Sequence, residues 1–180
     1  MNTIHILLLS VLLPLALVSQ YKVEQPQNPG TEVIDKFHVI GISARTTNEN
    51  QQAATDIEAL WTKFWGEEIA KQVPNTVNTD IYALYTDYET DYTGAYTVIL
   101  GLPVSSLDEI PQGFVGITVE KDAYQKFVSK GKMPEAVIDT WREIWSNETL
   151  NRAYHIDFTV HGKKYYDGDK AEVETFISVE

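Results

Sequence analysis

Aromatic side chains give this sequence its clearest capacity to bind other molecules. The chain contains 10 Tyr, 6 Phe and 4 Trp among 180 residues. Aromatic rings stack on flat molecules, and their faces attract cations. Tyr124, Trp141 and Tyr154 are the candidates for such contacts, and packing in the hydrophobic core is the alternative for each. For Trp65 and Trp145 we favour the core interpretation.

Carboxylates and histidines offer fewer candidates. Glu174 lies in the β-rich segment 171–179 between apolar neighbours, where a buried carboxylate needs a compensating partner. There it would bind a cation or act as a general acid–base, and an exposed position on an edge strand is the alternative. His155 and Asp157 are two residues apart, so a strand would place them on one face. That spacing is common without catalysis, and we interpret it as ordinary.

The sequence lacks the patterns that are typical of bound metals and cofactors. It has no Cys, which excludes disulfides and thiolate ligands. His38 and His161 do not complete a convincing set of three metal ligands. No glycine-rich phosphate loop, Gly-x-Ser-x-Gly or His-Glu-x-x-His motif occurs. We therefore predict no cofactor and no metal.

The charge of the chain restricts its partners. The formal net charge is −12, whereas nucleic-acid binding needs a basic surface. A nucleic-acid partner is therefore not expected. An acidic chain favours cationic small molecules or basic proteins, and a merely soluble acidic surface is the alternative.

The amino terminus carries an apolar run over residues 6–18, interrupted by Ser10. This run is shorter than the ~20 residues of a membrane-spanning helix, and it fits the apolar region of a secretory signal. We interpret residues 1–20 as a signal-like or membrane-tethering segment and expect an exported or tethered protein. No Lys or Arg precedes the run and no Ala-x-Ala site follows it, so a cytoplasmic protein is the alternative. Residues 21–32 are predicted to be a linker.

Two segments share one amphipathic pattern. Each places apolar residues at i, i+4, i+7 and i+8, which is one face of a helix. The residues are Ile57, Trp61, Phe64 and Trp65 in the first segment, and Val137, Trp141, Ile144 and Trp145 in the second. Helices are predicted over 51–71 and 134–147. The repeated Trp-x-x-apolar-Trp pattern indicates two copies of one unit around a shared interior.

Strand patterns flank both helices. The predicted strands are 37–44, 79–87 and 95–104 around the first helix, and 114–119, 123–129, 151–162 and 171–179 around the second. These elements predict an α/β (α+β) domain over 33–180, built from duplicated βαββ units in the halves 33–104 and 114–180. Pseudo-twofold symmetry and a central cleft between the halves follow, with Tyr82 corresponding to Tyr154. Such a cleft is the expected ligand site.

The order of several short motifs resembles the gyrase-inhibitor-like (GyrI-like) effector-binding family, whose domain also occurs in AraC-type and drug-sensing transcription regulators. The motifs lie at 39–48, 110–113, 122–131, 133–136, 140–145, 154–158 and 173–174. The resemblance implies the duplicated fold, a ligand that is often cationic or amphipathic, and an acid at Glu174 that points into the cleft. Some drug-sensing relatives carry an acid directly after the tyrosine that matches Tyr154. Here His155 stands there, which weakens the expectation of a strictly cationic ligand.

These observations favour a stand-alone module that binds a hydrophobic or cationic organic ligand through Glu174, Tyr124, Trp141 and Tyr154. The resemblance also suggests two alternatives. One is a hydrolase of small cyclopropane-type compounds, in which Glu174 would transfer the proton. The other is a protein-interaction or inhibitor module that would use the acidic surface of the chain, and one family member binds and inhibits DNA gyrase. The sequence leaves the choice between binding and catalysis open.

Overall fold

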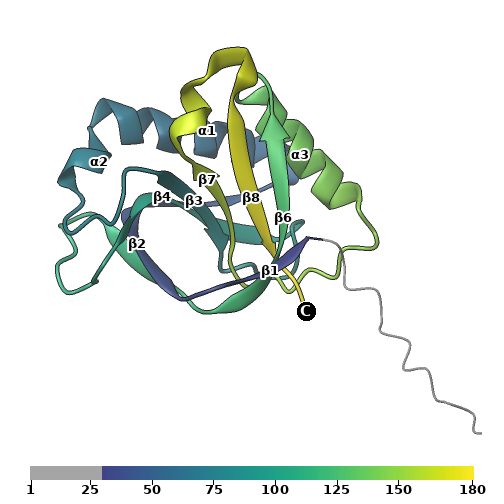
Figure 1. Ribbon diagram of the computed structural model, residues 1–180, viewed down its shortest axis with the longest axis horizontal. Coiled ribbons are helices and arrows are strands. Elements are labelled where there is room, and N and C mark those ends of the chain that lie inside the picture. Colours follow the sequence, from purple (N-terminus) through teal and green to yellow (C-terminus); the bar gives the residue numbers. More distant parts are fainter. Residues whose placement is uncertain (1–29) are drawn as a thin grey trace, which may run out of the picture.

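The computed structural model describes residues 30–180 and shows one curled antiparallel sheet with helices on one face (Figure 1). The strands are β1 (Thr31–Ile34), β2 (Phe37–Thr47), β3 (Ile81–Thr86), β4 (Ala95–Val104), β5 (Val115–Val119), β6 (Asp122–Lys130), β7 (Asp157–His161) and β8 (Glu172–Ser178). The helices are α1 (Gln52–Gly66), α2 (Ile69–Gln72) and α3 (Glu135–Ser146). Three short 3-10 segments are η1 (Glu49–Gln51), η2 (Lys163–Tyr166) and η3 (Gly168–Lys170). The mixed α+β class is thereby confirmed.

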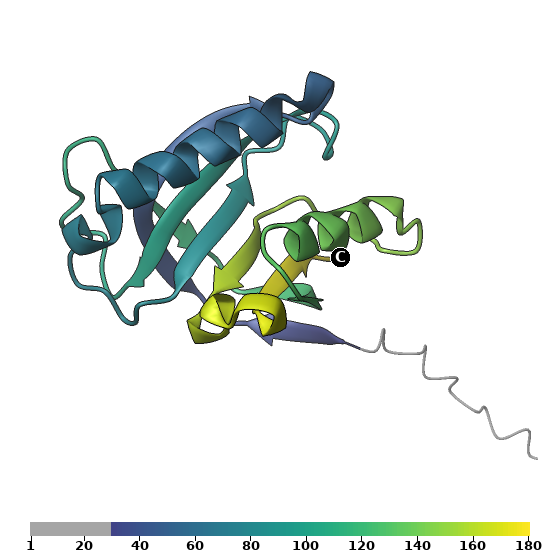
Figure 2. The ribbon, with the colours of Figure 1, turned by 90° about the horizontal axis from the view of Figure 1, so that it is seen from above.

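The order of the strands is symmetrical about the middle of the sheet. The order is β1-β6-β8-β7-β3-β4-β2-β5. The first unit supplies β2, α1, β3 and β4, and the second unit supplies β6, α3, β7 and β8. The two strands that follow the long helices, β3 and β7, pair with each other at the centre. The predicted duplication of a βαββ unit is therefore confirmed, with the two units joined in one continuous sheet (Figure 2).

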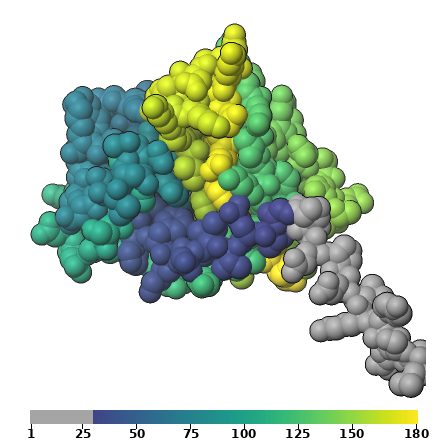
Figure 3. All heavy atoms as spheres, viewed as in Figure 1, coloured from purple at the N-terminus to yellow at the C-terminus, as the bar shows by residue number. Residues whose placement is uncertain are grey.

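Each unit is extended at its outer edge by a strand that precedes the other unit in the chain. β1 comes just before β2 in the chain but pairs with β6, and β5 comes just before β6 but pairs with β2. In Figure 3 the segment that contains β1 and the start of β2 (purple) crosses the surface from the second unit to the first. Because β1 begins at Thr31, the last two residues of the predicted linker 21–32 belong to the sheet.

Two predicted elements are shorter than the sequence suggested. The helix predicted over 51–71 breaks after Gly66, because Glu68 adopts a left-handed backbone with φ 51°. The strand predicted over 151–162 is formed only from Asp157 to His161. Tyr154 has φ 54°, which is incompatible with an extended strand. The connection from α3 to β7 therefore leaves the extended conformation before β7 begins, and its residues Arg152 and Ala153 pair with residues 178 and 179 at the end of the chain.

The sheet has a helix face and an opposite face. On the helix face, α1 buries Phe64 and Leu60 against β2 and β4, while α3 buries Ile144 against Ile177 of β8. On the opposite face, buried side chains of seven strands pack without a helix. These are Val39, Leu84, Ile99, Val119, Tyr124, Phe158 and Phe176.

Within residues 30–180, none of the helices combines the length and the apolar character that crossing a membrane requires. The segment 1–20 and most of the predicted linker lie outside the described residues.

Candidate functional site

A cavity of about 990 Å³ opens on the helix face between α1 and α3. All four tryptophans of the chain line it. Its walls come from α1, α3 and the β3–β4 connection, and its floor comes from the central strands. The main lining residues are Ile57, Trp61, Trp65, Tyr85, Tyr88, Tyr92, Tyr96, Val137, Trp141, Trp145, Arg152, His161 and Tyr165. The preference for Trp65 and Trp145 as core residues is wrong, because both side chains reach this cavity.

The two walls repeat one arrangement. Trp61 and Trp65 of α1 stack with ring centroids 6.1 Å apart, and Trp141 and Trp145 of α3 have the same separation. The outer tryptophan of each pair lies at the mouth, since Trp65 is 47% exposed and Trp145 is 36% exposed. Tyr92 stacks on Trp145 with an angle of 12° between the ring planes. Apolar aromatic surfaces at the opening of a cavity suit a flat or bulky aromatic ligand.

The floor of the cavity carries no charge at neutral pH. Tyr85 lies 4.7 Å from Trp141 and 6.2 Å from Tyr96, centroid to centroid. Burial raises the pKa of Tyr85, and it raises the pKa of Tyr96 to about 12. His161 packs 5.0 Å from Trp61, and burial lowers the pKa of its imidazole to about 4. Both tyrosines and His161 are therefore neutral at pH 7.

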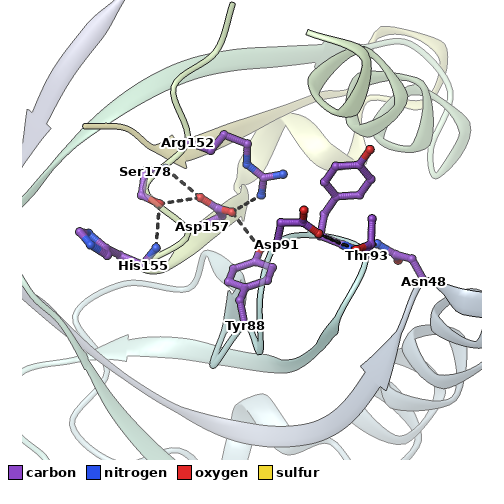
Figure 4. Close-up of polar contacts among 9 residues, drawn as sticks. Asn48, Tyr88, Asp91, Thr93, Arg152, His155, Asp157 and Ser178 are labelled. Carbon is purple, nitrogen blue, oxygen red and sulfur yellow. Dashed lines mark hydrogen bonds and ion pairs between the residues drawn. The ribbon is translucent and has the colours of Figure 1, made fainter. Parts of the chain in front are cut away.

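One ion pair lies at the side of the cavity, on the connection from α3 to β7. The Arg152 Nη2 donates to Asp157 Oδ2 at 2.6 Å, and the two side chains are only 5% and 0% exposed. Tyr88 also donates its hydroxyl to Asp157 Oδ2, at 2.8 Å. The other carboxylate oxygen, Oδ1, accepts from the backbone N–H of Ser178 at 2.8 Å and from its hydroxyl at 3.0 Å (Figure 4). The Asp157 carboxylate is thus held by four donors.

The groups around Arg152 keep its guanidinium charged. Burial would lower the pKa of the guanidinium, but Asp157, Tyr88 and Tyr154 together outweigh it and the pKa rises. Arg152 Nε and Nη1 are buried and have no hydrogen-bond partner among the described residues. The same is true of His161 Nδ1, whose other nitrogen, Nε2, lies 2.9 Å from Thr159 Oγ1. The cavity wall therefore has unused hydrogen-bonding capacity.

Of the four predicted ligand-binding residues, Trp141 lines the cavity, and Tyr154 contacts two lining residues without lining the cavity itself. Trp141 forms part of the wall. Tyr154 packs directly behind it, with its ring 5.4 Å from Tyr88 and 4.3 Å from the guanidinium carbon of Arg152.

Tyr124 and Glu174 lie on the opposite face of the sheet. Tyr124 packs 5.1 Å from Phe158 in the core of that face. The Glu174 Oε1 is 2.5 Å from Lys126 Nζ. The expectation that Glu174 faces the cleft is corrected, because alternate residues of a strand face opposite sides. In β8, Ile177 packs toward α3. Glu174 is an odd number of residues away in the same strand, so its side chain points to the opposite face of the sheet.

His155 and Asp157 do not form an acid–base pair, in agreement with the interpretation of their spacing as ordinary. The His155 Nδ1 lies 2.8 Å from Asp122 Oδ2, while Asp157 is engaged by Arg152. Sequence reasoning missed Arg152, Tyr88 and His161 as cavity residues. Arg152 and Tyr88 lie in connections without a period, and His161 lies on the face of β7 that alternation could not assign to a cavity. Among residues 30–180, no three His, Cys, Asp or Glu side chains gather as a metal site would require.

Comparison with known proteins places this fold among effector-binding proteins. Residues 32–179 match the Cass2 family, described as integron-associated effector binding protein. The curated relative YobU of Bacillus subtilis, described as a candidate transcriptional regulator, is 27% identical over 150 residues. That alignment covers 81% of this chain and 94% of YobU.

Solved structures agree with the family match. The integron cassette protein VCH_CASS2 of Vibrio cholerae is 32% identical, with a TM-score of 0.66 over 84% of this chain and 97% of that chain. SAV2435, whose structure was solved bound to tetraphenylphosphonium, has a TM-score of 0.70 at 17% identity. That alignment covers 83% of this chain and 92% of SAV2435, and it shows a shared fold.

Proposed function

Since this chain belongs to the integron-associated effector-binding protein family, we propose that it binds a small organic molecule with an aromatic or apolar body in the cavity between α1 and α3. The observation that carries this proposal is the gathering of all four tryptophans around one cavity of about 990 Å³. Such a volume lies at the upper end of the range for pockets that hold drug-sized ligands.

The arrangement of the walls explains how such a ligand is held. The inner pair, Trp61 and Trp141, is largely covered by protein, whereas Trp65 and Trp145 are partly exposed to solvent. A ligand between the helices would cover these outer rings and remove apolar surface from water. Large aromatic side chains that stay exposed at a concave surface commonly serve recognition. The known binding of an aromatic cation by SAV2435 is consistent with a ligand of this size.

Fluorescence titration tests the proposal directly, because every indole of the chain lines the cavity. The wild-type protein is titrated with a panel of neutral and cationic triaryl and polycyclic compounds. At least one compound should change the tryptophan emission saturably, with one site per chain. Trp145→Ala and Trp65→Ala should each weaken binding by about 0.5–1.5 kcal/mol, the typical value of an aromatic pair.

A matched control truncates an exposed aromatic residue that does not line the cavity. Tyr166 is 65% exposed and is not among the lining residues. Tyr166→Ala should leave the affinity unchanged. The proposal fails if no compound of the panel changes the emission, or if Tyr166→Ala and Trp145→Ala reduce the affinity equally.

A further inference from the structure

The residues around Arg152 form a cage suited to a cation. The ring of Tyr154 lies 4.3 Å from the guanidinium carbon, and the ring of Tyr88 lies 5.9 Å from it. These two rings meet edge to face, 5.4 Å apart. The buried carboxylate of Asp157 completes the cage. Aromatic faces together with a desolvated carboxylate are the surroundings that proteins use to hold organic cations.

Arg152 fills this cage incompletely. A guanidinium offers five N–H donors, and in this structure Nη2 binds Asp157 while Nε and Nη1 have no partner among the described residues. Buried donors without partners are unfavourable. The Asp157 carboxylate, in contrast, accepts three further hydrogen bonds that do not involve Arg152, one from Tyr88 and two from Ser178. The cage therefore does not depend on Arg152 alone for its shape.

Arg152 presents a positive charge to the cavity, and the other charged groups nearby do not outweigh it. Glu58 and Arg142 line the cavity with opposite charges, and both are exposed to solvent. Asp91 lies close enough to interact with Arg152, but its carboxylate already accepts from the backbone and hydroxyl of Thr93. Of these groups, the Arg152–Asp157 pair is the one removed from solvent, and Arg152 is the member of the pair that lines the cavity.

We propose that Arg152 is an internal occupant of a cation-binding cage and thereby selects uncharged, acceptor-bearing aromatic ligands over lipophilic cations. This inference rests on the proposed function. An incoming cation would have to displace Arg152 or lie beside it, and either is unfavourable in a site of low dielectric. A neutral ligand with an oxygen acceptor faces no such repulsion, and a small shift of the guanidinium would let Nε or Nη1 donate to that oxygen.

Two probes of nearly equal shape test the inference. Methyltriphenylphosphonium is a permanent cation, and triphenylphosphine oxide is neutral and carries one strong acceptor oxygen. The wild-type protein should bind the oxide more tightly than the phosphonium. In Arg152→Met the cage keeps its rings and its carboxylate but loses its occupant. The ratio of the two dissociation constants should then shift toward the phosphonium by at least tenfold.

The double variant Arg152→Met with Asp157→Asn is the control, because it empties the cage and removes its charge. It should lose the gain in phosphonium affinity, which shows that the gain comes from the carboxylate. Thermal unfolding provides a second measurement if Arg152→Met is poorly folded by itself. The phosphonium should stabilise this variant more than it stabilises the wild type, because a ligand that binds only the folded state stabilises it.

The outcomes separate this inference from the proposed function. If no compound of the larger panel binds, the proposed function fails. If compounds bind but the ratio is the same in wild type and Arg152→Met, only the role of Arg152 is overturned. An Arg152→Met protein that stays unfolded in saturating phosphonium would also overturn it, because a cation in the cage should replace the missing guanidinium.

Discussion

In the first unit, the strand that follows the long helix begins with Ile81, whereas the corresponding strand of the second unit begins with Asp157. The ladder between β3 and β7 is centred on the Ala83–Thr159 pair, so a twofold axis through that pair carries Ile81 onto Asp157. Ile81 packs in an apolar cluster under α1 and α2. Asp157 is held by Arg152, Tyr88 and Ser178 beside the cavity.

This difference shows which parts of the duplicated unit were kept alike and which diverged. The two tryptophan pairs form equivalent walls, because both helices present the same face to the cavity. The connections after the helices differ. The first contains α2, which buries Ile69, and the second carries Arg152 and Tyr154 to the cavity side. The duplicated helices therefore form the apolar walls of the cavity, and the connection that differs between the units supplies its charged residue, Arg152.

The largest expected effect comes from removing the charge that distinguishes the two units. Asp157→Asn leaves the buried guanidinium of Arg152 without its counter-charge and should destabilise the fold by about 3–5 kcal/mol. The matched change in the first unit, Ile81→Val, should cost only about 0.5–1.5 kcal/mol. Urea unfolding of both variants measures the contrast. Equal losses would mean that the two strand positions are energetically alike after all.

A second contrast concerns His161, which the same axis relates to Tyr85. Burial lowers the pKa of His161 from 6.5 to about 4, so the unfolded chain binds the proton more tightly than the folded chain does. The stabilisation by neutral His161 is complete above pH 6.5 and is lost as the pH falls toward 4. The loss should reach roughly 3 kcal/mol, from about 1.4 kcal/mol per pKa unit.

The variant His161→Phe isolates this contribution from that of the carboxylates. The stability difference between wild type and His161→Phe, measured by urea unfolding from pH 7 to pH 4, should change by the amount stated above. Tyr85→Phe in the first unit should show no such change over the same range, because a tyrosine with a raised pKa stays neutral there. Parallel pH profiles for wild type and His161→Phe would refute the assignment.

The smallest effect is expected on the opposite face of the sheet. Glu174 pairs with Lys126, and its side chain is 46% exposed. Glu174→Gln should therefore change the stability by no more than about 1 kcal/mol. It should also leave the affinity for any cavity ligand unchanged, since the residue lies across the sheet from the cavity. A loss of affinity of tenfold or more in a fluorescence titration would return Glu174 to the binding site.

Much of the fold was predictable from periodic patterns. The Trp-x-x-apolar-Trp spacing gave both helices and the duplication, because helix faces and strand alternation are local properties of the chain. The candidate site was less predictable. Trp141 was found because it belongs to such a pattern, whereas Arg152 and Tyr88 lie in connections without a period. Matching Tyr82 to Tyr154 was also wrong, since the centre of the β3–β7 ladder makes Phe158 its counterpart.

The sequence by itself determined that two similar units exist and that each carries an apolar helix face with two tryptophans. It determined this because residues within one turn or one strand are fixed relative to each other by backbone geometry. Only the tertiary structure decided that the four indoles share one cavity and that Glu174 and Tyr124 lie across the sheet from it. The pairing of β3 with β7 joins the two units in one sheet, and the alternation of side chains in the paired strands β6 and β8 puts Tyr124 and Glu174 on the face away from the helices. The order of strands and the course of a connection depend on contacts between distant segments, which no local spacing encodes.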